Sequence, residues 1–260
     1  MRGHWLPLGL VVLVTMLPGC AQFLDVVGRP TVKAVRPKIT GINLQGVDVA
    51  FEMDVDNPYV VPLKSPALHY GLDIEGSEFI TAKDAVTVDL PASGTGTVTL
   101  PVSLTYSKLR ETYKKLADAK QFAYRLHGSL GVAAMGRTFE LPLSHSGTLP
   151  VLRPPKFSNV KLRFAGTAFT VDADVQNPNL FALGLKNLGY GLKLGDVVVG
   201  DLVASTLDSV APGGSGHVTL KGKLSAASAL MRLTGGGRLG APNLAPVGVI
   251  ETPYGAVKLK

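Results

Sequence analysis

Hydrophobic and polar side chains alternate along residues 47–56. The positions of one parity are all apolar: Val47, Val49, Phe51, Met53 and Val55. Those of the other parity are mostly acidic: Asp48, Ala50, Glu52, Asp54 and Asp56. Because successive side chains of a strand point to opposite faces, the pattern predicts a half-buried strand with an acidic, solvated face. The same alternation predicts a second such strand, with four residues facing inward: Phe169, Val171, Ala173 and Val175.

Each of these strands stops at an Asn-Pro pair, Asn57-Pro58 in the first and Asn177-Pro178 in the second. Proline cannot donate to a sheet ladder, and it favours extended geometry in the residue before it. An asparagine side chain can hydrogen-bond nearby backbone and begin a turn. We therefore interpret Asn57 and Asn177 as structural corner residues. The alternative, that they contact a ligand, is not needed to explain them.

Asn57 and Asn177 are 120 positions apart, and other features recur at this offset. The further matches are Tyr70-Gly71-Leu72 with Tyr190-Gly191-Leu192, Val98-Thr99-Leu100 with Val218-Thr219-Leu220, and Gly96 with Gly216. The period is the length of a whole domain and far exceeds that of a solenoid unit. The sequence thus predicts one domain used twice, at residues 37–152 and 155–260.

The remaining patterns predict short strands punctuated by Gly and Pro, with one helix in each copy. The strands are expected at 67–74, 78–88, 97–104, 122–132, 137–144 and 148–152, and in the second copy at 188–194, 197–203 and 217–224. The helices are expected around Leu109, Tyr113 and Leu116, and around Leu230 and Leu233. The second copy is expected to lack the last strand, which leaves an open sheet edge. The predicted fold class is mainly β, with two tandem antiparallel β-sandwiches and one α-helix in each.

Residues 1–19 are predicted to be a signal peptide, because Arg2 precedes an apolar run from Leu6 to Leu17. Leu17-Pro18-Gly19-Cys20 follows, and Cys20 is the only cysteine of the chain. This segment resembles the lipobox of bacterial lipoproteins, although Pro18 departs from the small residue usual there. The resemblance implies cleavage before Cys20 and lipid on its sulfur. The alternatives are an ordinary secretory signal with a chance cysteine, or a signal anchor.

Ala21 follows the cysteine, and the resemblance to lipoprotein sorting then implies the outer membrane, facing the periplasm. Residues 20–36 show no sustained period and are predicted to be a tether. With a single cysteine, no intramolecular disulfide can form. The membrane, through lipid on Cys20, is the partner that this interpretation predicts.

Without Arg2 the chain has 25 basic and 19 acidic residues, a net charge of +6. One basic group belongs to the predicted first helix: Lys108, Arg110, Lys114, Lys115 and Lys120. It is interpreted as a solvated helix face, with anionic head groups or cell-wall polymers as the alternative partner. Nucleic acid is not expected, because no basic arm is interleaved with aromatics.

Candidate chemistry is sparse, and neither a catalytic residue, a metal nor a cofactor is predicted. The histidines are isolated in sequence and lack metal-ligand spacing: His4, His69, His127, His145 and His217. Gly213-Gly214-Ser215-Gly216 is not a Gly-x-Ser-x-Gly nucleophile elbow. The acidic positions of the two alternating strands, which include Asp172 and Asp174, diverge from a flat strand. They are interpreted as a solvated face in preference to a calcium site.

Two stretches carry a family resemblance: Asp54-Val55-Asp56-Asn57-Pro58-Tyr59 with Tyr70-Gly71-Leu72, and Asp174-Val175-Gln176-Asn177-Pro178-Asn179 with Tyr190-Gly191-Leu192. In this order they resemble the group-2 late embryogenesis abundant (LEA-2, or WHy) domain. The resemblance implies fibronectin-III- or immunoglobulin-like sandwiches with one helix, and a non-enzymatic role linked to desiccation or other stress. Asn179 departs from the pattern set by Tyr59.

Two functional hypotheses follow. The first is a membrane-tethered protective or scaffolding protein that acts without turnover under desiccation or osmotic stress. The second is a module of the cell envelope that binds or transfers a lipid or another hydrophobic ligand, because sandwiches rich in Val and Leu could open between their sheets. An envelope protein partner is possible under either hypothesis.

Overall fold

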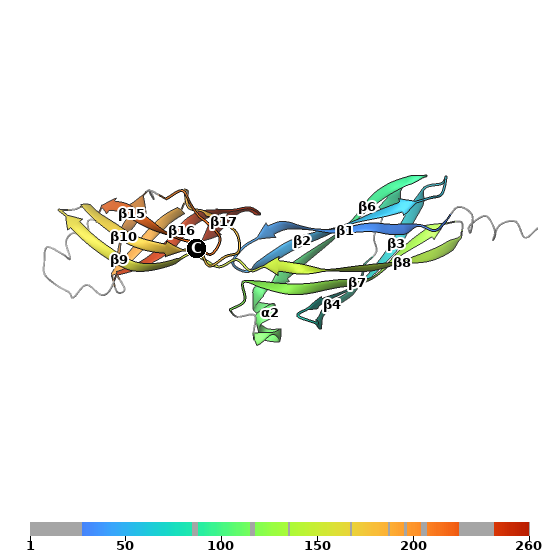
Figure 1. Cartoon of the computed structure of the whole chain (residues 1–260), viewed down its shortest axis with the longest axis horizontal. Coiled ribbons are helices and arrows are strands. Elements are labelled where there is room, and N and C mark those ends of the chain that lie inside the picture. The colour runs from blue at the N-terminus through green and yellow to red at the C-terminus, as the bar shows by residue number, and fades with distance from the viewer. Residues whose placement is uncertain are drawn as a thin grey trace, which may run out of the picture.

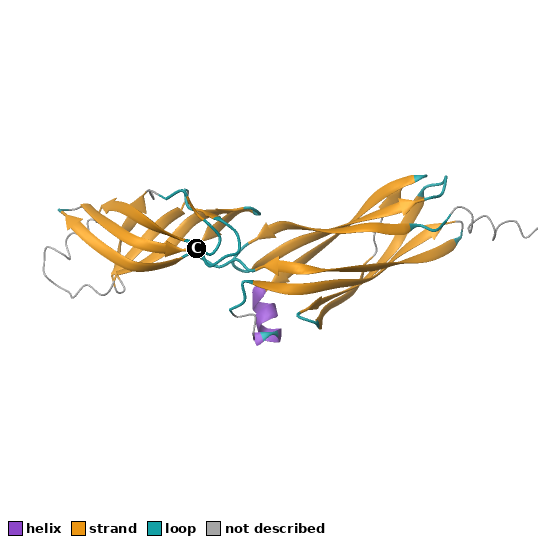
Figure 2. Cartoon of the chain, viewed as in Figure 1, coloured by secondary structure: helices purple, strands orange, loops and turns teal. Residues whose placement is uncertain are grey.

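The computed structural model describes residues 28–259, apart from residues 85–87, 115–117, 135, 167, 187, 195–196, 204–206 and 224–241. Its strands form two units that lie end to end (Figure 1). Strands dominate both units, and one short helix lies beside the first (Figure 2). The predicted mainly β, antiparallel fold is therefore confirmed.

The first unit, residues 31–150, is a sandwich of two antiparallel sheets. One sheet has the order β1-β2-β6, with β1 at Thr31–Ile42, β2 at Gly46–Asn57 and β6 at Gly94–Thr105. The other has the order β4-β3-β7-β8, with β4 at Ser77–Asp84, β3 at Leu63–Ile74, β7 at Gln121–Ala134 and β8 at Arg137–Pro150. Strand β5, Val88–Leu90, pairs with β3. The predicted inward face of β2 is confirmed, because Val47, Val49, Phe51, Met53 and Val55 are all buried.

The second unit, residues 156–259, is one continuous nine-stranded sheet. Its path is β14-β11-β16-β12-β13-β15-β10-β9, and β17 pairs with β16. The strands are β9 Lys156–Ala165, β10 Ala168–Gln176, β11 Leu183–Gly184, β12 Leu188–Leu194, β13 Val197–Val203, β14 Ser209–Val210, β15 Ser215–Lys223, β16 Pro242–Thr252 and β17 Gly255–Leu259.

Strand register is shared between the two units. The following pairs correspond at an offset of 120: Met53↔Val98 and Ala173↔Val218, Leu63↔Leu90 and Leu183↔Val210, Leu72↔Ile80 and Leu192↔Gly200. In the last hairpin the offset becomes 118, with Leu130↔Leu141 matching Gly248↔Leu259. The same residues therefore face each other in both units over most of the sheet.

The units differ in how their sheets meet. In the second unit β13 pairs directly with β15, through Leu202↔Gly222 and Val203↔Lys221, which joins the two layers. A Cβ at Gly222 would lie 2.5 Å from Phe169 Cζ and 2.7 Å from Leu202 Cδ2, so only glycine leaves room for this approach. The first unit has the buried Val102 at the corresponding position, and its sheets stay separate.

Residues 31–36 correct the sequence prediction, which placed them in the tether. They form the first half of β1 and pair with β2 from Thr31↔Asp56 to Arg36↔Glu52. A register shift between Val32 and Ala34 breaks the period of two, so alternation could not reveal the strand.

The helix and the last strands also differ from expectation. Helix α2 covers only Tyr106–Thr112, and Tyr113 is its C-cap. Leu116 and the predicted second helix, around Leu230 and Leu233, lie outside the described residues. The expected strand at 148–152 is the end of β8, which reaches Pro150.

The last hairpin of the second unit is shorter than its counterpart. Strand β17 has five residues where β8 has fourteen, and it pairs only with Gly248–Thr252 of β16. On that side, residues 242–247 have no strand partner in the part of the chain that the structure describes.

Candidate functional site

The first Asn-Pro corner is built on the buried Asn57, at the end of β2. Its Nδ2 donates to the carbonyls of Val61 at 2.9 Å and Pro91 at 2.7 Å, and its Oδ1 accepts from the Tyr59 amide at 3.0 Å. The side chain therefore ties the β2–β3 loop to the loop before β6. These contacts use both amide hydrogens, which leaves the buried group no donor to offer a ligand.

Asn177 makes the same set of contacts at the end of β10. Its Nδ2 donates to Phe181 at 2.7 Å and to the adjacent carbonyls of Val210 and Ala211 at 3.1 Å each. Its Oδ1 accepts from the Asn179 amide at 2.9 Å. Both corners thus bind the carbonyl four residues ahead, the amide two residues ahead, and a carbonyl 34 residues ahead.

The corners diverge at the residue two positions after the asparagine. Tyr59 is buried in the first unit, and its ring centroid lies 6.4 Å from that of Phe139. Asn179 is buried in the second unit, where its Oδ1 accepts from the Arg153 amide at 2.7 Å and its Nδ2 donates to the Arg153 carbonyl at 2.9 Å. The side chain thereby pairs with the backbone of the connection between the units.

Arg153 also reaches back to the first unit. Its guanidinium donates to the Ala119 carbonyl at 3.0 Å. Nearby, the Tyr106 hydroxyl accepts from the Leu152 amide at 3.2 Å and lies 3.3 Å from the Pro150 carbonyl, to which it donates. Burial raises the pKa of Tyr106 to about 12, which keeps this hydroxyl neutral and able to donate. We call this set the connector clamp: Tyr106, Leu152, Arg153 and Asn179.

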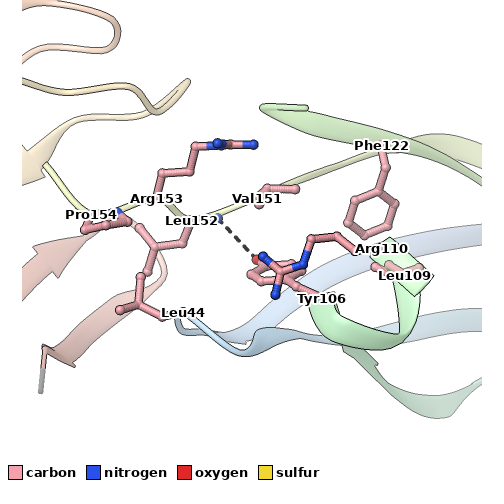
Figure 3. Close-up of a pocket in the computed structure, with 9 residues that line it drawn as sticks. All are labelled: Leu44, Tyr106, Leu109, Arg110, Phe122, Val151, Leu152, Arg153 and Pro154. Carbon is pink, nitrogen blue, oxygen red and sulfur yellow. Dashed lines mark hydrogen bonds between the residues drawn. The ribbon is translucent and has the colours of Figure 1, made fainter. Parts of the chain in front are cut away.

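A pocket of about 220 Å³ lies beside the connector clamp (Figure 3). Its lining is mostly apolar, with two arginines: Leu44, Tyr106, Leu109, Phe122, Val151, Leu152 and Pro154, with Arg110 and Arg153. Of the predicted basic helix group, Arg110 is the member that lines the pocket. Lys115 lies outside the described residues.

Gly71 of the first Tyr-Gly-Leu motif accommodates a histidine on the neighbouring strand. A Cβ at Gly71 would lie 2.5 Å from His127 Cε1, so glycine allows the imidazole to lie against β3. Beside it, the buried Asp73 accepts from Arg125 Nε at 2.9 Å, and its Oδ1 lies 3.2 Å from His127 Nε2. These contacts, Arg125 first, hold the pKa of Asp73 below its usual range. Sequence reasoning missed the cluster because it depends on the register of β3 with β7.

The second Tyr-Gly-Leu motif lacks this cluster. Tyr190 is buried and packs edge-on against Phe157, with ring centroids 5.6 Å apart, whereas Tyr70 is half-buried. Position 193, which matches Asp73, is a lysine. The Asp73 cluster is therefore not a site that the two units share.

Cations of the chain itself pair with two carboxylates on the acidic face of β2. The Arg36 guanidinium pairs with Asp54, and Lys33 Nζ lies 2.9 Å from Asp56 Oδ1. The bonds from Arg36 and then Thr97 hold the pKa of Asp54 below its usual range. The predicted solvated face is thus a cross-strand ladder of ion pairs.

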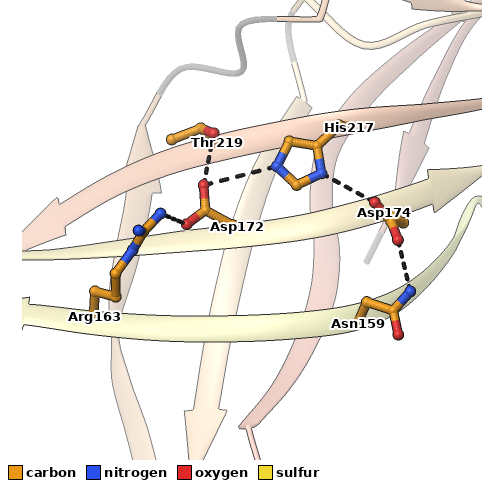
Figure 4. Close-up of polar contacts among 6 residues, drawn as sticks. All are labelled: Asn159, Arg163, Asp172, Asp174, His217 and Thr219. Carbon is orange, nitrogen blue, oxygen red and sulfur yellow. Dashed lines mark hydrogen bonds and ion pairs between the residues drawn. The ribbon is translucent and has the colours of Figure 1, made fainter.

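The acidic face of β10 forms the corresponding ladder (Figure 4). Asp172 accepts from Thr219 at 2.8 Å and pairs with the Arg163 guanidinium. Asp174 accepts from Asn159 Nδ2 at 2.7 Å, and its Oδ1 lies 3.0 Å from His217 Nδ1. The pKa of each carboxyl is lowered, by Thr219 and then Arg163 for Asp172, and by Asn159 and then His217 for Asp174.

Three of the histidines that are isolated in sequence have side-chain neighbours in the fold. His127 and His217 lie against aspartates, and His145 Nδ1 lies 3.0 Å from the Tyr124 hydroxyl. No cluster of three or more His, Cys, Asp or Glu able to hold a metal ion occurs within the described ranges.

Cys20, the predicted lipid-attachment residue, lies outside the described residues. The described part of the chain contains no helix long and apolar enough to cross a bilayer. The connector clamp was also not predicted as a site. The signal for it was Asn179, which the sequence had marked as the departure from Tyr59.

Solved structures to which this chain is similar include an archaeal and a plant protein. A crystal structure of a protein from Archaeoglobus fulgidus is 14% identical, covers 48% of this chain and 100% of that chain, and has a TM-score of 0.39. The solution structure of AT1g01470 from Arabidopsis thaliana is 22% identical over 46% of this chain and 80% of that chain, with a TM-score of 0.36. The solution structure of a putative late embryogenesis abundant (LEA) protein, At2g46140.1, is 23% identical. It covers 50% of this chain and 75% of that chain, with a TM-score of 0.40.

Comparison with curated proteins finds no match. The family model described as late embryogenesis abundant protein, LEA_2, matches residues 52–147. This range begins in β2 and ends in β8, and it includes Asn57-Pro58 and Tyr70-Gly71-Leu72. Over residues 52–147, the first unit of this chain therefore resembles the late embryogenesis abundant (LEA_2) family.

Proposed function

We propose that the chain is a non-enzymatic lipoprotein of the bacterial cell envelope that carries two LEA_2-like modules. The observation that supports this most is the buried asparagine corner, which makes the same backbone contacts in both units. The LEA_2 match covers the first unit, and the shared register extends the likeness to the second. A stress-related role is the function that the family supports.

The absence of turnover is inferred from how the polar side chains are used. Asp54, Asp73, Asp172 and Asp174 each pair with a cation or histidine of the same chain. A general base or metal ligand needs a carboxylate that is available to substrate or ion. The paired groups are better suited to stabilising sheets than to chemistry.

Tethering rests on Cys20 and on the short stretch after it. Thr31 begins β1, and eleven residues of extended chain reach at most about 40 Å. A lipid on Cys20 would therefore hold the outer end of the first unit near the membrane, and Ala21 favours the outer membrane facing the periplasm. Several acyl chains make such attachment effectively stable.

Mass spectrometry of the mature amino terminus tests the tether. We expect a chain that begins at an acylated Cys20, and we expect Cys20→Ser to move the protein from the membrane to the soluble fraction. An unmodified Cys20, or a Cys20→Ser protein that stays in the membrane fraction, would contradict the tether.

A gene deletion tests the protective role. We expect lower survival after drying or osmotic shock, restored by the wild-type gene and only partly by Cys20→Ser. Equal survival of the deletion and parent strains across these stresses would refute the protective role. Scaffolding would then be the remaining role under this hypothesis.

The pocket beside the connector clamp favours a second candidate function, binding of a lipid or another hydrophobic ligand. Its apolar lining and the two arginines, Arg110 and Arg153, suit a small amphipathic anion. Native mass spectrometry of the purified protein would show a retained ligand, lost in Leu109→Trp, which fills the pocket. A protein that is empty as isolated and does not bind a fluorescent fatty acid would exclude this function.

A further inference from the structure

Three large apolar side chains stand out as exposed among the described residues: Val60, Val61 and Leu180. Val60 is 80% exposed and Val61 39%, and the exposed Pro62 follows them in the β2–β3 loop. Leu180 occupies the position of Val60 in the second unit and is 47% exposed. Single exposed apolar residues are ordinary, but adjacent ones on one loop indicate a contact surface.

The loop that carries Val60 and Val61 is held on a rigid base. The Asn57 side chain binds the Val61 carbonyl, and the Ser93 amide donates to the Tyr59 carbonyl at 2.7 Å. Tyr59 itself is buried. The two valines are therefore presented outward by a fixed corner, so exposing them does not depend on loop motion.

This corner lies at the end of the first unit where the chain enters it. Thr31, the first residue of β1, is in register with Asp56, next to Asn57. The second corner lies instead beside the connection between the units, because Asn179 is hydrogen-bonded to Arg153 there. One corner thus faces away from the second unit, and the other faces the first.

Basic side chains surround the outer corner. Four basic residues are exposed at this end of the unit: Arg29, Lys33, Lys64 and Arg137. Their location follows from the strand register, in which Thr31 pairs with Asp56, Lys64 with Ala133 and Ala134 with Arg137. Lys33 is paired with Asp56. Arg29, Lys64 and Arg137 form no ion pair with the residues that the structure describes, and their charge complements an anionic surface.

We propose that this outer end is a membrane-docking tip, in which Val60, Val61 and Pro62 enter the head-group region of an anionic phospholipid bilayer. Arg29 and Arg137 would contact the lipid phosphates, and the second unit would point away from the membrane. The inference rests on the proposed lipoprotein function, because the lipid on Cys20 would bring this end to the bilayer. Apolar side chains with neighbouring basic residues are the composition of interfacial membrane contacts.

Tryptophan fluorescence reads the contact directly, since Trp5 is the only tryptophan of the chain and cleavage before Cys20 would remove it. In the mature chain, Val60→Trp and the matched control Leu180→Trp therefore each carry one reporter. The full chains are reconstituted in vesicles of phosphatidylcholine and phosphatidylglycerol that carry brominated acyl chains. We expect quenching of the reporter at position 60 and none at 180. Quenching at neither position, or equally at both, would overturn the tip.

A second measurement separates the tip from the tether. In the Cys20→Ser chain, Val60→Asp with Val61→Asp should lower partitioning onto phosphatidylglycerol vesicles about tenfold, and Leu180→Asp should change it less than twofold. If Cys20 proves not to be acylated but the two valine substitutions still lower partitioning, only the tether is contradicted. If the double valine variant and Leu180→Asp partition equally onto the vesicles, only the membrane-docking tip is contradicted. A valine-dependent dimer in sedimentation without vesicles would assign the surface to a second copy and overturn the lipid proposal.

Discussion

The two Asn-Pro corners form the same local structure with different neighbours. In each, a buried asparagine binds the carbonyl four residues ahead and the amide two residues ahead. Tyr59 then packs against an aromatic ring of its own unit, whereas Asn179 binds the backbone of Arg153 in the connection. A single difference in side chain thus accompanies a free corner in one unit and a junction in the other.

The sheets show a second difference of the same kind. Gly222 lets β13 approach β15 and joins the layers of the second unit, while Val102 fills the matching place in the first. Shared strand register therefore does not ensure a shared sheet topology, and we expect the side-chain volume at this position to contribute to the difference.

Removing the corner asparagines is expected to have the largest effect. Asn177→Ala removes the donor to three carbonyls, two of them buried, and the acceptor for Asn179, and should lower the free energy of unfolding by about 3–4 kcal/mol. Asn57→Ala should cost about 2–3 kcal/mol. Urea unfolding of each variant measures both losses, with Asn43→Ala, an exposed turn residue, as the control. If either corner variant unfolds like wild type, the corner does not stabilise its unit.

Exchanging residues 102 and 222 should have the next largest effect. Gly222→Val forces a side chain against Phe169 and Leu202 and should destabilise the second unit by about 1–3 kcal/mol. Val102→Gly leaves a cavity and a more flexible backbone, at about 2–4 kcal/mol in the first unit. Thermal unfolding followed by hydrogen exchange assigns each loss to its unit. A stable Gly222→Val protein with β13 still paired to β15 would show that side-chain volume does not decide the topology.

Asn179→Ala should cost less stability, about 1–2 kcal/mol, because it removes two hydrogen bonds to a partly solvated connection and one to Asn177. Its main effect should be to separate the unfolding of the two units, which calorimetry would resolve as two transitions. Tyr59→Phe is the matched control, since the Tyr59 hydroxyl has no hydrogen-bond partner among the described residues. A single unchanged transition in Asn179→Ala would mean that other contacts couple the units.

The ion-pair ladders should give the smallest effect, and one that depends on pH. The folded pKa values of Asp54, Asp172 and Asp174 lie below the ordinary value of 3.8. Their stabilisation is therefore complete above that value and is lost as the pH falls through the lower folded values. Urea unfolding from pH 7 downwards should show stability falling below about pH 4, with a shallower fall in Asp54→Asn and Asp172→Asn. Identical profiles in wild type and variants would show that the ladders do not contribute.

Much of the fold was predictable because alternation and repetition are local signals. The buried parity of β2 was visible in five apolar residues, and the ranges of β12 and β13 agree with those predicted. The first half of β1 could not be predicted because of its register shift. The predicted first helix was too long, because its i, i+4, i+7 pattern continues past the C-cap at Tyr113. Such features depend on tertiary contacts that a linear pattern does not contain.

The polar sites divide in the same way. Asn57 and Asn177 could be identified because their role depends on the adjacent proline and on backbone nearby. The partners of Asp54 and Asp172 could not be identified, since Arg36 and Arg163 meet them only through strand register. Asn179 stood out in the sequence as an anomaly. Its partner Arg153 could be identified only from the structure, which places the second unit against the connection.

We infer that Asn179 converts a repeated corner into a junction that fixes one unit relative to the other. Double electron–electron resonance tests it most directly, with spin labels on Thr99→Cys and Lys221→Cys in a Cys20→Ser background. We expect one narrow distance distribution in the parent, a markedly broader one in Asn179→Ala, and no broadening in Tyr59→Phe. A distribution that is already broad in the parent, or unchanged in Asn179→Ala, would contradict the claim.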